Sequence, residues 1–279
     1  MLSYRHAFHA GNHADVLKHL ILVQLARYLG QKDKPFWYID THAGAGAYAL
    51  DEGYATKLAE YREGIGRLWE RDDLPPLVAE YVALVRELND KGKLAVYPGS
   101  PWIARQTLRE QDRLRLFELH PADSELLAEN FSDLRDQAQV IAGDGFKGLK
   151  ALLPPPPRRA LVLIDPSFET ASDYTGVVTA LEEALRRFPT GTYALWYPLL
   201  SRPESRQLAD KLKRLPAAKW LHATLSVRAV AGPGMHGSGM FVINPPWTLE
   251  KGLRDTLPWL ANVLADGDGA GFKVEAYES

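Results

Sequence analysis

The chain has 279 residues, 46% hydrophobic and 24% charged, and this composition excludes a mainly disordered chain. It contains no cysteine, which excludes a disulfide framework, an iron–sulfur cluster and a cysteine nucleophile. Its formal net charge of −2 means that any nucleic-acid contact needs a local cluster of basic groups. The N-terminus lacks a signal-peptide pattern and the apolar runs are short, so a cytoplasmic protein without a membrane segment is expected.

The first elements in chain order are a helix and a strand. Apolar residues at helical spacing predict a helix over 13–29, with Gly30 placed to end it. An apolar strand over 36–40 follows and ends in an acid before a glycine-rich turn. Residues 52–110 separate this strand from the next by more than one crossover helix requires, and their pattern is mostly helical. We interpret 52–110 as an inserted helical subdomain.

The remainder alternates between strands and helices. Strands are predicted at 113–119, 139–143, 160–165 and 192–198, and helices near 121–130, 146–152, 175–188 and 203–215. Two apolar segments flanking the glycine-rich residues 232–239 indicate an antiparallel hairpin, and a helix (247–264) and a last strand (271–277) follow.

The predicted fold class is α/β. Fully apolar strands that alternate with helices are typical of a Rossmann-like, mostly parallel sheet covered on both faces. Residues 1–51 and 111–279 would form this domain, with an N-terminal motif over 1–19.

Three successive strands end in residues suited to a nucleotide cofactor. The first is followed by a GxG turn that contains Gly44, where the backbone can approach a ligand closely. The second ends in Glu118, which can accept both hydroxyls of a ribose, and the third ends in Gly143 and Asp144. Each feature alone is also typical of an ordinary strand-to-helix turn or a solvated carboxylate. Together they favour a cofactor site at one sheet edge.

The fourth strand ends in Asp165-Pro166-Ser167-Phe168, one substitution away from the pattern Asp/Asn-Pro-Pro-aromatic. A carboxylate and a backbone carbonyl that accept both N–H groups of a nucleobase amine would draw its lone pair back onto nitrogen. Proline fixes the chain for that carbonyl. The ring of Phe168 would stack the base and hold the amine in line with an electrophilic methyl group. The alternative is a plain strand-to-loop turn.

A second segment, Asn244-Pro245-Pro246-Trp247, matches this pattern better by letter. It follows a strand that we predict to be antiparallel, so it should lie at the opposite edge from Gly44. The two prolines are better explained as opening the next helix.

The N-terminal segment places four of the eight histidines within residues 6–19. A metal site is one interpretation, but the spacing is not HExxH and only two of the four histidines could easily share a helix face, so we disfavour it. The favoured interpretation is a segment that folds over a nucleotide pocket. Lys18 and His19 would then reach the carboxylate end of the cofactor, and Tyr4 and Arg5 would reach RNA.

These motifs together resemble the bacterial ribosomal large-subunit RNA methyltransferase J family, the 23S rRNA (adenine(2030)-N6)-methyltransferases. The resemblance rests on YRHAFHAGNHADVLKH, IDTHAGAGAY, PGSP, FELHP, GDG, the DPSFE segment and GSGMFVINPPW, and covers nearly the whole chain. It implies a class I S-adenosylmethionine-dependent methyltransferase fold with a small inserted helical subdomain. It also implies a catalytic Asp165 and an RNA contact at Tyr4. The implied cofactor contacts are His19, His42, Ser100, Glu118, Gly143 and Asp144.

The chain departs from the family pattern at Ser167 and Phe168, where proline and tyrosine are usual. The expected activity is S-adenosylmethionine-dependent methylation of an adenine N6 amine in 23S rRNA by a monomer without a metal. Asp165, Pro166 and Phe168 would be catalytic, Gly44 and Asp165 would also contact the cofactor, and Tyr4, Arg5 and Lys18 would contact RNA. Further basic residues, Arg202, Arg206, Lys211, Lys213 and Arg214, are candidates for guiding RNA or form a solvated helix face.

Three alternatives stay open. An adenine-N6 DNA methyltransferase would share the chemistry and differ in its substrate surface. A noncatalytic RNA-binding protein would retain a vestigial pocket. A nicotinamide-dependent oxidoreductase also uses a glycine turn and a strand-ending acid, but this turn lacks the third glycine of that fingerprint.

Overall fold

The computed structural model describes residues 6–51, 58–89, 92–232 and 234–279. Its strands are β1 (Trp37–Asp40), β2 (Ala47–Ala49), β3 (Val96–Pro98), β4 (Arg113–Glu118), β5 (Ala138–Ala142), β6 (Ala160–Ile164), β7 (Thr192–Leu199), β8 (Lys219–Ser226), β9 (Gly237–Ile243) and β10 (Gly271–Glu278). Its α-helices are α1 (His13–Gly30), α3 (Gly66–Trp69), α4 (Pro76–Glu87), α5 (Ser100–Thr107), α6 (Pro121–Asn130), α7 (Gly145–Leu152), α8 (Ala171–Arg187), α9 (Pro203–Leu212) and α10 (Trp247–Val263). Short 3₁₀ turns are η1 (His6–Phe8), η2 (Glu60–Glu63) and η4 (Ser132–Leu134).

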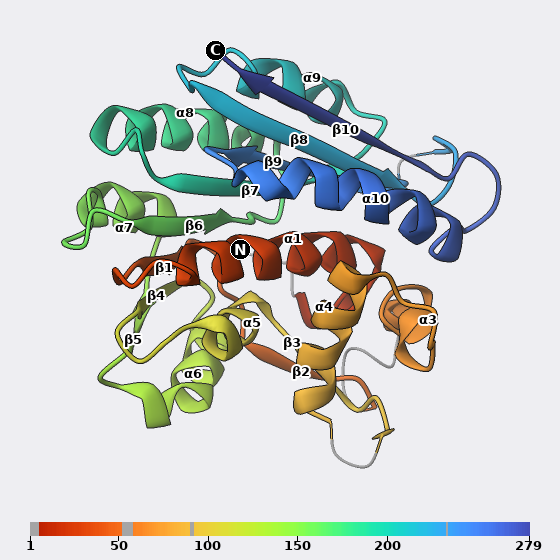
Figure 1. Cartoon of the computed structure of the whole chain (residues 1–279), viewed down its shortest axis with the longest axis horizontal. Helices are drawn as coiled ribbons and strands as arrows, with labels where there is room; N and C mark the ends of the chain where they lie inside the picture. Colours follow the sequence, from red (N-terminus) through yellow and green to blue (C-terminus); the bar gives the residue numbers. More distant parts are fainter. Residues whose placement is uncertain (1–5, 52–57, 90–91, 233) are drawn as a thin grey trace.

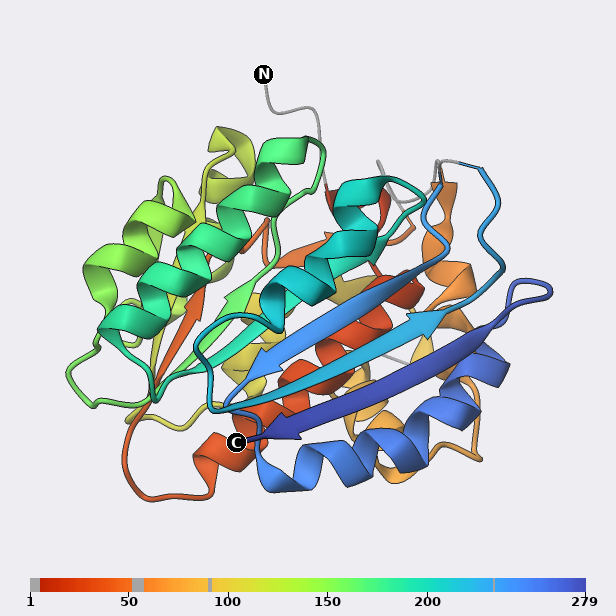
Figure 2. The same cartoon turned by 90° about the horizontal axis from the view of Figure 1, so that it is seen from above.

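The central sheet has eight strands in the order β10-β8-β9-β7-β6-β1-β4-β5 (Figures 1 and 2). Strands β5, β4, β1, β6 and β7 pair in parallel, as predicted. Strand β9 runs antiparallel to both β7 and β8, which confirms the predicted hairpin, and β10 pairs antiparallel with β8. The carboxyl ends of the parallel strands therefore meet at one edge of the sheet.

Helices cover both faces of the sheet. Helices α7, α8 and α9 pack on one face, and α1, α5, α6 and α10 pack on the other (Figure 1). Helix α1 begins at Asn12, whose side chain accepts hydrogen bonds from the amides of Ala14 and Asp15. It is buried on almost every side because it lies between the sheet and helices α4 and α5. Among the described helices, none has the length and apolar character that crossing a membrane requires.

The region between β1 and β4 differs in part from its prediction. Within the mostly helical region that was predicted, residues 60–69 form only the short 3₁₀ turn η2 and the four-residue helix α3. Gly64 lies between them and packs closely on the start of the first helix, since a side chain at Gly64 would stand 2.1 Å from the carbonyl oxygen of Gly11. The antiparallel pair β2–β3, which the sequence analysis missed, brings the two ends of the region together. The boundaries of an inserted subdomain at 52–110 stay a prediction.

Candidate active site

The carboxyl ends of β1, β4, β5 and β6 surround a cavity of about 280 Å³. Strand β1 lies between β4 and β6. The chain continues from β1 to β4 and β5 on one side of β1 and later returns to form β6 on its other side. Ligands of α/β sheets usually bind in the crevice at such a reversal of the strand order. Six of the predicted cofactor residues line this cavity: His42, Gly44, Ser100, Glu118, Asp144 and Asp165.

The glycine turn is tied to Glu118. Gly44 has a φ of +62°, and its amide donates a 2.8 Å hydrogen bond to one carboxylate oxygen of Glu118. The amide of His120 donates to the other oxygen at 2.7 Å. Burial raises the pKa of Glu118, and these two amides oppose the shift. Each oxygen keeps a lone pair, so the carboxylate can still accept hydroxyl groups from the cavity side.

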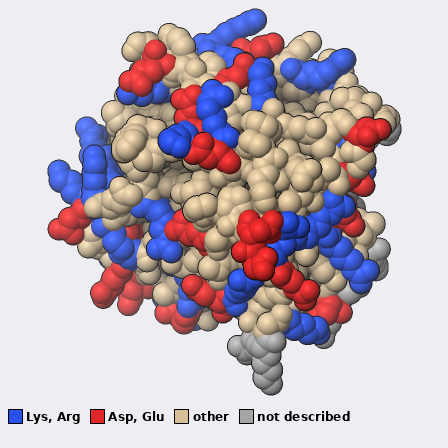
Figure 3. All heavy atoms as spheres, turned by 45° about the vertical axis from the view of Figure 1, so that its right-hand side comes forward, with Lys and Arg blue, Asp and Glu red and all other residues tan. Residues whose placement is uncertain are grey.

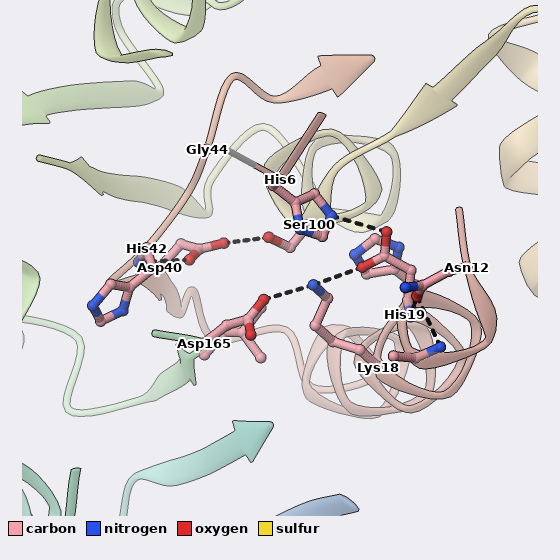
Figure 4. A network of polar contacts seen from close by, with 12 residues as sticks. His6, Asn12, Lys18, His19, Asp40, His42, Gly44, Ser100 and Asp165 are labelled. Carbon is pink, nitrogen blue, oxygen red and sulfur yellow. Dashed lines mark hydrogen bonds and ion pairs between the residues drawn. The ribbon is translucent and has the colours of Figure 1, made fainter. Parts of the chain in front are cut away.

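Asp40, at the end of β1, was missed as a site residue. It is fully buried and accepts hydrogen bonds from the hydroxyls of Tyr38 and Ser100, both at 2.7 Å. Burial raises its pKa to about 6, although these donors favour the ionised form. The carboxylate fixes Ser100 at the cavity wall (Figure 4). A strand-ending acid before a GxG turn was the available signal for this role.

His42 and Asp144 form another part of the wall. Burial lowers the pKa of His42 to about 4, so its imidazole is neutral at pH 7. Its ring meets the Phe146 ring edge-on at 5.1 Å. The carboxylate of Asp144 caps α7 by accepting from the amides of Phe146 and Lys147. The wall therefore presents a neutral aromatic surface beside a helix N-terminus.

The strand-ending Asp165 contacts a residue of α1. The Nζ atom of Lys18 lies 2.6 Å from Oδ2 of Asp165 and 2.8 Å from Oδ1 of Asp15 (Figure 4). Burial lowers the pKa of Lys18, but the two carboxylates outweigh this and raise it. Burial likewise raises the pKa of Asp15, and the neighbouring His6 and Lys18 bring it well below its usual range. Lys18 is therefore a buried cation held by two acids.

A second cavity of about 270 Å³ shares Lys18 and Asp165 with the first as lining residues. Asp165 and Ser167 line both cavities, whereas Pro166 lines only the first. Phe168 lines the second but is only 2% exposed, and its ring packs against Tyr174 at a centroid distance of 4.8 Å. Its stacking role stays a prediction.

Other predicted site residues lie elsewhere. His19 is fully buried away from both cavities, its Nδ1 lies 2.8 Å from the Tyr97 hydroxyl, and burial lowers its pKa to about 3. Gly143 bonds through its amide to the backbone carbonyl of Glu118 and is not part of the cavity wall. Tyr4 and Arg5 lie outside the described residues.

The second motif-like segment, residues 244–247, follows β9 and lies at the sheet edge that the antiparallel direction of β9 predicts. Ile243 pairs with Tyr193 near the start of β7, so Asn244 stands at the edge opposite to the cavity. The amide group of Asn244 donates to the carbonyls of Pro189 and Gly191. Pro246 caps α10, in agreement with the helix-opening interpretation.

The histidines of the N-terminal motif have separate partners. His6 lies 2.9 Å from Asp15, and His9 lies 3.0 Å from Glu60. Within the described part of the chain, no group of three or more possible ligands is placed to hold a metal ion.

The basic candidates of α9 are dispersed. Arg202 lines the second cavity and its guanidinium lies 5.8 Å from the Tyr174 ring, whereas Lys213 is paired with Glu275 at 2.8 Å. On the face shown in Figure 3, basic and acidic side chains are interspersed and do not separate by sign. The guiding role of the residues at 202–214 stays a prediction.

Five parallel strands, the reversed strand β9 and a cavity at the β1–β6 switch point form the Rossmann-like fold of the class I methyltransferases. A family model described as "Ribosomal RNA large subunit methyltransferase D, RlmJ" matches residues 33–276. The chain belongs to this family.

Relatives match nearly the full length of the chain. It is 50% identical over 265 residues to "Ribosomal RNA large subunit methyltransferase J" of Escherichia coli (strain K12), across 95% of this chain and 94% of the relative. It is 48% identical over 277 residues to the protein of the same name in Haemophilus influenzae, across 99% and 98% of the two chains. A crystal structure from Legionella pneumophila has 37% identity, a TM-score of 0.89, and covers 96% of this chain and 98% of its own.

The cofactor of this class is S-adenosylmethionine, as expected from the sequence. The residues of the first cavity fit this molecule. Glu118 offers a backbone-anchored carboxylate of the type that accepts ribose hydroxyls. Glycine at position 44 lets the turn pack tightly between Glu118 and the Tyr48 hydroxyl, where a side chain would collide with that hydroxyl. His42 and Phe146 offer flat, uncharged surfaces for a purine.

Proposed function

We propose that this protein transfers a methyl group from S-adenosylmethionine to the N6 exocyclic amine of an adenine in 23S rRNA. The observation that carries the proposal is the position of Asp165, which lines both the cavity containing Glu118 and the neighbouring second cavity. A donor in the first cavity and an acceptor base in the second would meet at this carboxylate. The names of the relatives support ribosomal RNA as the substrate class.

The chemistry explains why a carboxylate is needed at this point. The lone pair of an adenine amine is delocalised into the ring, which makes the nitrogen a poor nucleophile. Asp165 and the backbone carbonyl of Pro166 would each accept one amine N–H and thereby localise the lone pair on nitrogen. The bound cofactor supplies an electrophilic methyl group on a sulfonium. The amine becomes acidic as it is methylated, so its proton can leave without a strong base.

Lys18 fixes the Asp165 carboxylate before the base arrives. Its ammonium holds one oxygen of Asp165 through a 2.6 Å contact. Because Asp15 holds the same ammonium from the other side, the carboxylate is oriented by a buried, preformed pair.

The target adenine must leave any helix to reach this site. The N6 amine lies on the pairing edge of adenine, so the base has to be unpaired or flipped into the second cavity. We therefore propose free or precursor 23S rRNA with an accessible adenine as the substrate.

The test incubates purified protein and radiolabelled S-adenosylmethionine with unmodified 23S rRNA, DNA or assembled large subunits. The expected result is label in RNA, recovered as N6-methyladenosine, and none with Asp165→Ala. Label in DNA alone would support the DNA alternative. Failure to bind the cofactor in a calorimetric titration would support a noncatalytic RNA-binding protein.

A further inference from the structure

The acceptor site in the proposed reaction needs a flat apolar surface beside Asp165. The sequence motif predicts that the ring of Phe168 provides it. In the structure this ring is 2% exposed and φ of Phe168 is +51°, with Tyr174 packed against it. Most of its surface is therefore already covered by the protein.

Trp196 lies at the same level on the adjacent strand. The parallel pairing of β6 with β7 sets Ile164 opposite Leu195, so the next residues, Asp165 and Trp196, follow side by side. Leu195 and Tyr197 point into the core beneath α8 and α9, and alternation turns Trp196 toward α1. The Nζ atom of Lys18 lies 5.8 Å from the Trp196 ring centroid.

Trp196 is partly exposed and lines the second cavity together with Asp165 and Ser167. Its indole nitrogen is buried and has no hydrogen-bond partner among the described residues. The part of the side chain that is open to the cavity is therefore the carbon surface of the ring, which suits stacking and not hydrogen bonding.

We propose that Trp196 is the residue on which the acceptor base stacks, and that Phe168 supports the Trp196 ring from within the core. The centroids of the two rings lie 6.1 Å apart with an interplanar angle of 58°, which is a supporting contact. This inference rests on the proposed function. The base-stacking role that the sequence motif predicts for Phe168 is thereby assigned to Trp196 on β7.

The test compares Trp196→Leu and Trp196→Phe with the wild type in methyl transfer to a 23S rRNA fragment. Loss of base stacking should lower kcat/KM for RNA about 10- to 100-fold in Trp196→Leu, and Trp196→Phe should recover most of it. The affinity for S-adenosylmethionine, measured by calorimetry, should stay within about twofold because Trp196 is absent from the first cavity. Trp220→Leu, a sheet tryptophan outside both cavities, is the matched control.

A second readout reports stacking directly. An RNA with 2-aminopurine at the methylated position should stay quenched when bound to the wild type and become bright when bound to Trp196→Leu. Unchanged kcat/KM and unchanged quenching in folded Trp196→Leu, with an active wild type, would overturn this inference alone. A wild type that binds S-adenosylmethionine but methylates no RNA would overturn the proposed function and the inference with it.

Discussion

Lys18, which is buried, and Asp165, which is partly buried, form an ion pair that joins the first helix to the end of the fourth parallel strand. Their Nζ and Oδ2 atoms are 2.6 Å apart, and the side chains are 4% and 13% exposed. Residues 147 positions apart in sequence thus meet at the boundary between the two cavities. Because Asp15 shares the same ammonium, removal of the lysine would take the cation from Asp165 and leave Asp15 with His6 alone beside it.

Lys18→Met should therefore destabilise the fold as well as abolish activity. Removing one partner of a buried pair leaves an uncompensated charge and typically costs about 3 to 5 kcal/mol. Urea denaturation should show a loss of this order. Lys251→Met is the control, since Lys251 pairs with Asp255 on the exposed surface and should cost less than about 1 kcal/mol. Equal effects of the two substitutions would contradict the assignment of Lys18 as a buried cation.

Asp40 should make stability fall as the pH rises from about 4 to about 6. Its folded-state pKa is raised by burial to about 6 from an ordinary value of 3.8. The folded state therefore binds more protons than the unfolded state in this window, and up to roughly 3 kcal/mol of stability is lost across it. Asp40→Asn should be less stable overall, because its amide nitrogen cannot accept the same hydrogen bonds, but its stability should depend less on pH. Denaturant titrations across the window that give parallel pH profiles for both proteins would contradict this prediction.

Glu118→Ala should weaken cofactor binding. Hydrogen bonds to a charged group contribute about 1.5 to 3 kcal/mol, so we expect a dissociation constant about 10- to 100-fold higher by calorimetry. Glu125→Ala removes an exposed acid from the helix that follows and should change nothing. Wild-type affinity in Glu118→Ala would show that the cofactor does not use this carboxylate.

Gly44→Ala should disrupt the turn for two separable reasons. A side chain there would stand 2.2 Å from the Tyr48 hydroxyl, and the φ of +62° is unfavourable for alanine. Gly92→Ala has a similar φ of +74° with open space around it, so it measures the conformational cost alone. Cofactor affinity should fall sharply in Gly44→Ala and not in Gly92→Ala. The double variant Gly44→Ala/Tyr48→Phe should recover part of the lost cofactor affinity. No recovery would mean that the collision with the Tyr48 hydroxyl does not contribute to the loss.

Much of the fold follows from local patterns in the sequence. Apolar strands at 160–165 and 192–198 and the glycine-rich hairpin were predicted, and the strand directions correctly separated Asp165 from Asn244. Helix α8 begins at Ala171, four residues before the predicted start, because Thr170 and Asp173 form a capping box that was overlooked.

The strand ends were sufficient to predict which residues gather around the first cavity, whereas contacts between distant segments were missed. Parallel strands bring Gly44, Glu118 and Asp165 to one edge, and the sequence pattern was sufficient for these. The burial of Lys18 between two acids depends on how α1 crosses the sheet, and no local pattern carries that information. The coverage of the Phe168 ring likewise depends on tertiary packing against Tyr174.

In the proposed reaction Asp165 stands between a donor cavity and an acceptor cavity. A crystal structure with S-adenosylhomocysteine and adenosine monophosphate tests this most directly. We predict ribose hydroxyls of the cofactor product on Glu118 and the adenine amine of the nucleotide within hydrogen-bonding distance of Asp165. A cofactor product bound beside Asn244, or an adenine amine facing away from Asp165, would contradict the account.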